Sequence, residues 1–168
     1  MATAPAHGIT PDQVGGTVTQ AQIDQAVHTI STLCDWQPWP VRRETLTVRA
    51  PGDPEVFLPT TRLTEVHSIT IDGKNIDVED IEWWEDGILE VTPPRRGRWP
   101  RRFRVEADVT HGHDVGTLLG LVGAMARRAA QPQEDYSVGR ISISAPGTMT
   151  PQSTEWRIID QFKLGPMP

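Results

Sequence analysis

The sequence has little cysteine and no long apolar run, and both shortages limit where the protein can act. Cys34 is the single cysteine among 168 residues, which excludes an internal disulfide and favours a reducing compartment. No apolar run approaches the ~18 residues that a membrane span needs. Residues 1–10 lack the basic and apolar regions of a signal peptide. We therefore expect a protein made and assembled in the cytoplasm, with no membrane partner.

Recognisable catalytic motifs are also lacking. The chain has no glycine-rich phosphate loop, no nucleophile elbow and no paired-carboxylate motif. Cys34 falls on the apolar stripe of a predicted helix, which favours a buried and inert thiol. The net charge of -6 argues against a protein that lives by binding phosphate backbones, but local contact with DNA stays open. We expect a protein that is not an enzyme and needs no cofactor.

The segment His111-Gly112-His113-Asp114 is the single candidate for a metal or acid–base site, as in a hydrolase. Two histidines and a carboxylate could ligate zinc, but adjacent residues rarely converge on one ion without a distant fourth ligand. We favour the other interpretation, in which the segment is a strand end, a glycine turn and a helix cap. No metal ligand is predicted.

Two amphipathic helices are predicted. Thr19 and Gln22 have the spacing of a capping box, and apolar residues recur at helical spacing over residues 23–34. Asp114 is the expected N-cap of the second helix, whose apolar stripe covers residues 115–129 and ends in arginines.

Strand patterns fill the middle of the chain. Alternation or short apolar runs predict strands over residues 44–49, 56–58, 66–71, 103–109 and 138–144. Asp72-Gly73 predicts a two-residue hairpin turn, and Glu85-Asp86-Gly87 predicts a second hairpin with Gly87 in the left-handed conformation. These patterns predict an α+β fold in which two amphipathic helices pack with an antiparallel, hairpin-built sheet.

Domain boundaries follow from composition. Residues 1–18 have no periodicity and predict a flexible N-terminal arm, followed by a body over residues 19–145. Pro146-Gly147 separates a C-terminal helical arm over residues 146–168, whose helix should begin at Thr150-Pro151. Its apolar residues, too many for a solvated tail, are a candidate interface with a partner or neighbouring subunit: Trp156, Ile158, Ile159, Phe162 and Leu164. In one interpretation this helix instead caps the chain's own core, with Trp156, Ile159 and Phe162 on one face.

Two blocks of like charge are the other candidate surfaces. The acidic block consists of Asp77, Glu79, Asp80, Glu82, Glu85 and Asp86, and the arginine block consists of Arg95, Arg96, Arg98, Arg101, Arg102 and Arg104. The blocks could pair between subunits or across a hairpin, or the arginines could contact DNA. Both could also be solvated hairpin faces.

Tryptophan supplies six of the ten aromatic residues. Tryptophan is enriched at interface hot spots, but it is equally at home in the core of a small domain. Surface tryptophans at positions 83, 84 and 99 would suit a small β-rich binding module, for example one for a glycan. That interpretation leaves the two helices and the apolar tail unexplained.

The order of these elements resembles a known family. The run VFLPTTRLTEVHSITIDG (residues 56–73) is similar to the middle of head-to-tail adaptor, or connector, proteins of long-tailed bacteriophages. Trp99-Pro100, the strand end Val109-Thr110-His111-Gly112, the apolar helix after it and the tail EWRIIDQFKLG resemble the same family. The resemblance covers most of the chain from Thr19 onward.

This resemblance implies a structural role in the neck of the virion. Such proteins form a ring, typically dodecameric, that docks on the portal protein and extends the channel through which the genome leaves. A stopper or tail completion protein follows, and the DNA passes in transient contact. The nearest alternative is a stopper or tail-terminator of the same neck.

Overall fold

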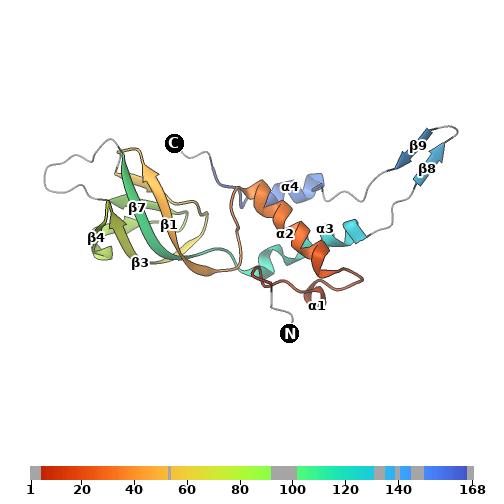
Figure 1. Cartoon of the computed structure of the whole chain (residues 1–168), viewed down its shortest axis with the longest axis horizontal. Coiled ribbons are helices and arrows are strands. Elements are labelled where there is room, and N and C mark those ends of the chain that lie inside the picture. The colour runs from red at the N-terminus through yellow and green to blue at the C-terminus, as the bar shows by residue number, and fades with distance from the viewer. Residues whose placement is uncertain are drawn as a thin grey trace. The chain divides into compact units, whose positions relative to one another are not determined.

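The computed structural model describes residues 5–52, 54–91, 102–130, 135–138, 141–144 and 150–165. The chain divides into two compact units, a helical unit (Met1–Asp35 and Asp114–Phe162) and a β unit (Trp36–His113 and Lys163–Pro168). Helices and antiparallel sheets are both present, so the predicted α+β class is confirmed (Figure 1). The division into two units differs from the expected single body over residues 19–145, because the helices pack mainly on one another and the sheets share their own core.

Four helices of the described chain belong to the helical unit. Their bounds are α1 (Pro11–Val14), α2 (Gln20–Cys34), α3 (Val115–Ala130) and α4 (Ser153–Ile159). None of the helices in the described ranges is long and apolar enough to cross a bilayer.

Helix α2 begins and ends as its sequence predicts. The Gln22 side chain accepts a hydrogen bond from the Thr19 amide at 2.8 Å, and the Thr19 hydroxyl accepts one from the Gln22 amide at 3.4 Å. The first bond satisfies the Thr19 amide, and the Gln22 amide also donates to the Thr19 carbonyl at 3.1 Å. Asp35 ends the helix in the left-handed conformation, with φ 62°. The apolar stripe of α2 is buried: Ile23, Ala26, Val27, Ile30 and Cys34.

Helix α3 packs against α2 and also confirms its prediction. Asp114 precedes the helix, and its carboxylate accepts a hydrogen bond from the Gly116 amide at 2.7 Å. The residues of α3 that are buried share one helical stripe: Leu118, Leu121, Val122, Met125 and Ala126.

The N-terminal segment does not form the flexible arm that its composition predicts. Ile9 is fully buried, and His7 is buried with its Nε2 2.9 Å from a carboxylate oxygen of Asp24 on α2. The Gln20 side chain donates to the Ile9 carbonyl at 3.1 Å. Arg127 of α3 donates to the Val14 carbonyl at 2.9 Å. One buried isoleucine and polar contacts to both long helices therefore hold a segment that has no periodicity of its own.

Two antiparallel sheets form the β unit. The four-stranded sheet has the order β1-β7-β3-β4, with β1 (Arg42–Ala50), β3 (Leu63–Ile71), β4 (Lys74–Ile76) and β7 (Phe103–His111). The three-stranded sheet has the order β2-β6-β5, with β2 (Glu55–Phe57), β5 (Ile81–Trp83) and β6 (Ile88–Val91). A 3₁₀ helix, η1 (Val78–Asp80), precedes β5.

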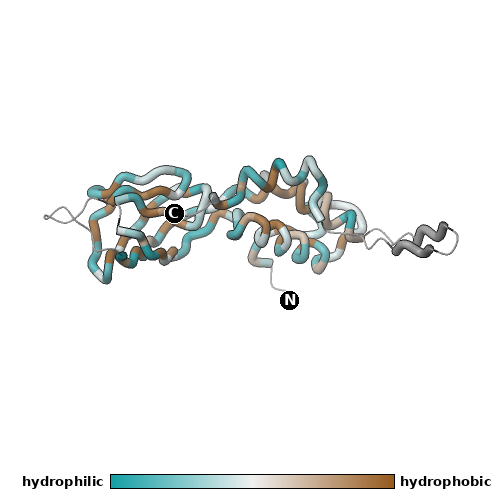
Figure 2. The backbone as a smooth tube through the Cα atoms, turned by 90° about the horizontal axis from the view of Figure 1, so that it is seen from above, coloured by the Kyte–Doolittle hydropathy of each residue, from teal (hydrophilic) through white to brown (hydrophobic). Residues whose placement is uncertain are grey.

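The core of the β unit draws on both sheets. Along β7 the residues at odd positions from Phe103 to Val109 are buried and those between them are not, which confirms the predicted half-buried strand. The same alternation of apolar and hydrophilic residues runs through the strands in Figure 2. One buried cluster joins these residues to Leu46 of β1, Ile69 of β3 and Leu89 of β6. The two sheets therefore fold as a single β unit.

Both predicted hairpins are present. Asp72 and Gly73 have φ of 46° and 80° and join β3 to β4. Gly87 has φ 88° in the turn between β5 and β6. A Cβ at Gly87 would lie 2.6 Å from the Thr60 carbonyl oxygen, so this turn requires glycine for space as well as for conformation.

A further hairpin follows α3. Strands β8 (Asp135–Val138) and β9 (Ile141–Ser144) pair antiparallel. The sequence predicts one strand over residues 138–144, so the first strand was missed. Residues 135–138 alternate as residues 141–144 do, and pairing the two segments satisfies backbone groups that a lone strand leaves open.

Candidate interaction surfaces

The predicted C-terminal interface is divided between core and surface. Trp156 and Ile158 of α4 are exposed, at 38% and 39% of their area. Ile159 and Phe162 are buried in the helical unit, at 0% and 6%. Leu164 is half-buried. Since two of these residues are core residues, the segment up to Phe162 is an integral part of the helical unit rather than a separate arm, and Leu164 is assigned to the β unit.

The face that the spacing of Trp156, Ile159 and Phe162 suggests is not the face that the C-terminal segment buries. The sequence suggests Trp156, Ile159 and Phe162, whereas the buried residues are Glu155, Ile159 and Phe162. Both sets fit helical spacing. Judged by apolarity alone, Trp156 is a better candidate for burial than Glu155. The structure buries Glu155 because it has a cationic partner, which leaves the tryptophan exposed.

That partner is Arg128 of α3. The guanidinium donates to both carboxylate oxygens of Glu155, at 2.9 and 2.7 Å. Only 20% and 11% of the Arg128 and Glu155 side chains are exposed. Glu155 also accepts a hydrogen bond from the Gln152 amide at 2.7 Å, which satisfies the first turn of α4. Sequence reasoning placed Arg128 at the basic end of α3 but missed this pairing.

The electrostatics of Glu155 favour its ionised form. Burial raises the pKa of this carboxyl, but the hydrogen bonds from Arg128 and from the Gln152 amide outweigh burial, so the pKa lies below its usual value. The carboxylate therefore stays charged at neutral pH, and the bidentate pair fixes α4 on α3.

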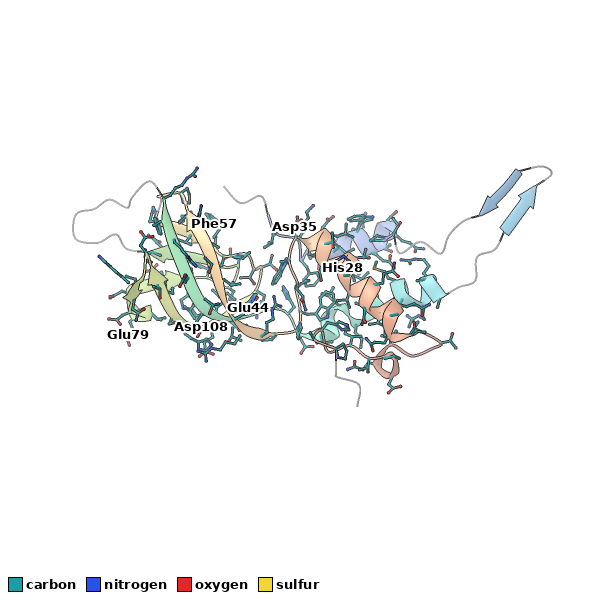
Figure 3. The ribbon with its side chains drawn as sticks, viewed as in Figure 1. His28, Asp35, Glu44, Phe57, Glu79 and Asp108 are labelled. Carbon is teal, nitrogen blue, oxygen red and sulfur yellow. The ribbon has the colours of Figure 1, made fainter. Side chains whose placement is uncertain are left out.

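The acidic block forms an exposed surface of the β unit. All six predicted residues, Asp77, Glu79, Asp80, Glu82, Glu85 and Asp86, are exposed. Glu79, on η1, lies at the periphery of the β unit in Figure 3. Of the ion pairs among described residues, one includes a member of the block, the pair between Glu85 and Arg62.

Pairing of strands adds two glutamates that the sequence did not single out. Glu90 of β6 lies directly opposite Glu55 of β2 on one side and Glu82 of β5 on the other. We call these three exposed residues the glutamate row. No ion pair of the described residues includes any of them. Like charges directly opposite each other destabilise a sheet, so the row raises the energy of the free protein.

The arginine block is described only in part. Arg95, Arg96, Arg98 and Arg101 lie outside the described residues. Arg102 and Arg104 are exposed, and Arg104 pairs with Glu106 of the same strand at 2.6 Å. Among the described residues, neither block thus forms an ion pair with the other block.

The histidine segment has the predicted structural arrangement. His111 ends β7, Gly112 turns with φ 109°, and Asp114 caps α3. His111 Nε2 lies 2.7 Å from the Glu44 carboxylate and its ring stacks on Trp36 at 5.9 Å between centroids, whereas His113 Nε2 lies 3.1 Å from the Thr61 hydroxyl. The two imidazoles therefore have separate hydrogen-bond partners, although both rings contact Trp36. Among the described residues, no group of three or more histidine, cysteine, aspartate or glutamate side chains could hold a metal ion.

His111 favours the neutral form. Burial lowers its pKa, and the charge of Arg42 lowers it further, against the opposing effect of Glu44. With Nε2 bonded to Glu44, its Nδ1 is buried and has no partner among the described residues. Protonation would place a proton on that unpaired nitrogen. Figure 3 shows Glu44 on β1. The sequence gave no signal for the contact between Glu44 and His111, because the two residues are 67 positions apart.

The described tryptophans differ in exposure. Trp39 is fully buried, and Trp36 is buried beside His111. Trp83 packs against the core of the β unit, whereas Trp84 is 44% exposed. Trp99 lies outside the described residues. Trp84 and Trp156 are the exposed tryptophans of the described chain, and they belong to different units.

Comparison with known proteins adds no assignment. No protein-family model matches the sequence, and no curated protein matches it with significant similarity.

Proposed function

We propose that the protein is a head-to-tail adaptor of a tailed bacteriophage, a structural subunit that forms a ring beneath the portal. The proposal starts from the resemblance of residues 56–73, of the strand end at His111 and of the tail from Glu155 to adaptor proteins. In this role the ring extends the DNA exit channel and offers a docking surface to a stopper or tail completion protein. The site of action is the virion neck, after assembly in the host cytoplasm.

The observation that carries the proposal is the exposure of Trp156 and Ile158 on a helix that is fixed in place. Residues two apart on a helix do not face each other, so Trp156 and Ile158 mark two sides of α4 as candidate partner surfaces. Because 38–39% of the area of each residue is still exposed, complete burial of each would contribute roughly 0.6–1.2 kcal/mol. Because Arg128 and Glu155 already order α4, binding requires little further loss of conformational entropy. We assign these two side chains to the portal or to a neighbouring subunit.

The charge of the β unit supports assembly into a ring. A heterologous ring needs two different, complementary surfaces on each subunit. The glutamate row and the acidic block provide a negative surface that is strained in the free chain. The arginine block provides the positive counterpart, and Arg102 and Arg104 are its exposed members in the described chain. Pairing across subunits would relieve the repulsion within the row.

The test is co-purification with the portal protein of the same bacteriophage. An adaptor binds the portal directly, in the absence of every other neck protein. A stopper binds only when an adaptor is supplied, and a tail-terminator binds tail proteins instead. Failure to bind the portal under any salt condition would contradict the adaptor role.

A further inference from the structure

The hairpin of β8 and β9 has a fully defined register. Asp135 lies opposite Ser144, Tyr136 opposite Ile143, Ser137 opposite Ser142 and Val138 opposite Ile141. The register runs through all four pairs without a shift. Two strands of four residues are at most marginally stable in water by themselves.

This register sorts the eight residues by polarity. Directly opposed residues share a face, and successive residues alternate between faces. Tyr136, Val138, Ile141 and Ile143 therefore occupy positions on one face. Asp135, Ser137, Ser142 and Ser144 occupy positions on the other. The hairpin is thus amphipathic in its register positions, as a strand pair within a larger sheet would be.

The outer edges of the hairpin carry little of the usual protection. Each strand is short and β8 has one charged residue, Asp135, but other protective features are absent from the described strands. Within the part of the chain that the structure describes, each of the two strands pairs only with the other. Proteins protect open edges with very short strands, with charged side chains, above all lysine, with proline, or with β-bulges that twist the edge away. Residues 135–138 and 141–144 contain no lysine and no proline, and their ladder contains no bulge. Such an edge is suited to pairing with another strand.

We propose that β9 of one copy pairs antiparallel with β8 of the next copy, so that the hairpins of neighbouring subunits form one continuous sheet. The inference rests on the proposed ring. Within one chain β8 already complements β9, so β8 of the next copy can complement it as well. Pairing of β9 with β8 around a closed ring leaves no open strand edge, whereas pairing of β9 with β9 leaves the β8 edges of both copies open.

The register of this contact follows from the faces and the strand lengths. The apolar positions have even numbers in β8 and odd numbers in β9. Apolar positions of the two copies therefore lie opposite each other only when the numbers of each opposed pair add up to an odd number. Among such registers, the one found within the hairpin opposes all four residues of each strand. It places Ser142 of one copy opposite Ser137 of the next.

Cysteine crosslinking tests this register. Chains carrying Ser137→Cys and chains carrying Ser142→Cys, with different affinity tags, are co-expressed, concentrated and mildly oxidised. Directly opposed residues of an antiparallel pair have Cα atoms about 4.5–5.5 Å apart, within the range of a disulfide. We expect a disulfide-linked pair bearing both tags, and no such pair from either variant alone. The wild-type chain controls for Cys34, which is fully buried.

A register-shifted pair is the matched control. Ser137→Cys mixed with Ser144→Cys displaces the thiols by two residues along the strand, so its mixed product should be several-fold less abundant. Equal yields from both mixtures, no mixed product, or crosslinking of Ser142→Cys with itself would each overturn the contact. If the chain still bound the portal in that case, the proposed adaptor role would stand and only this contact would be removed.

Discussion

Arg128 and Glu155 form a bidentate ion pair that joins α3 to α4, with Nη1–Oε1 at 2.9 Å and Nη2–Oε2 at 2.7 Å. The pair explains why α4, which the sequence analysis placed in a separate C-terminal arm, belongs to the helical unit. It also fixes the helix that presents Trp156 and Ile158, the residues on which the proposed function depends.

Substituting Glu155→Gln should destabilise the protein by about 1.5–3 kcal/mol, because the largely buried guanidinium of Arg128 loses a charged partner. Chemical denaturation at neutral pH measures this difference. Arg157→Met, at an exposed position of the same helix, is the control and should stay within about 0.5 kcal/mol of wild type.

Acid should remove the same contribution. Because the pKa of Glu155 is lowered in the folded protein, its stabilisation is present above the usual carboxyl pKa and is lost as pH falls through the folded value. The difference between wild type and Glu155→Gln should therefore shrink below about pH 4. A difference that stayed constant across this range would show that the ion pair does not stabilise the fold.

His111 should make the β unit sensitive to mild acid. Its pKa is lowered in the folded protein, so the unfolded chain takes up a proton first as pH falls below about 6.5, and stability decreases. Melting temperatures measured from pH 8 to pH 5 should fall less steeply for His111→Gln than for wild type. His28→Gln, at an exposed position of α2, should retain the wild-type slope.

Two glycines separate conformational strain from steric conflict. Gly73→Ala should cost about 1–2 kcal/mol, because its φ of 80° disfavours a side chain although nothing lies within 4 Å of the new Cβ. Gly87→Ala should cost about 3 kcal/mol or more, because its Cβ would also meet the Thr60 carbonyl oxygen at 2.6 Å. Equal losses for the two variants in chemical denaturation would contradict this account of the second hairpin.

Local features of the fold were predictable from the sequence. The capping box at Thr19, the Asp72-Gly73 turn and the alternation along β7 each depend on residues that are close in the chain. Periodicity and turn chemistry report such features directly. They were sufficient for the α+β class and for most element positions.

Features that depend on distant partners were not predictable. The glutamate row comes from three strands whose pairing no local pattern specifies. Burial of Glu155 depends on Arg128, and burial of the N-terminal segment depends on Ile9 and on contacts from His7 to Asp24. In each case a polar or irregular segment is ordered by an interaction that only the folded chain creates.

Removing the central charge of the glutamate row should reduce the repulsion among its carboxylates. Glu90→Gln should raise the melting temperature by about 1–3 °C, since Glu90 faces both Glu55 and Glu82. The gain should diminish in high salt, which screens exposed charges. Glu79→Gln, outside the ladder, should show no comparable gain. A loss of stability in Glu90→Gln would mean that other groups of the same chain neutralise the charges of the glutamate row.

The most direct test of the proposed role is the affinity of purified chains for the portal protein. The double variant Trp156→Ser with Ile158→Ser should lose about 10-fold in affinity from two lost anchors, measured at a temperature at which the variant is still folded, because more than half of each residue is covered in the free protein. Trp84→Ser, at an exposed tryptophan of the β unit, should bind as wild type does. Portal binding that is unchanged in the double variant would contradict the assignment of α4 as the docking surface.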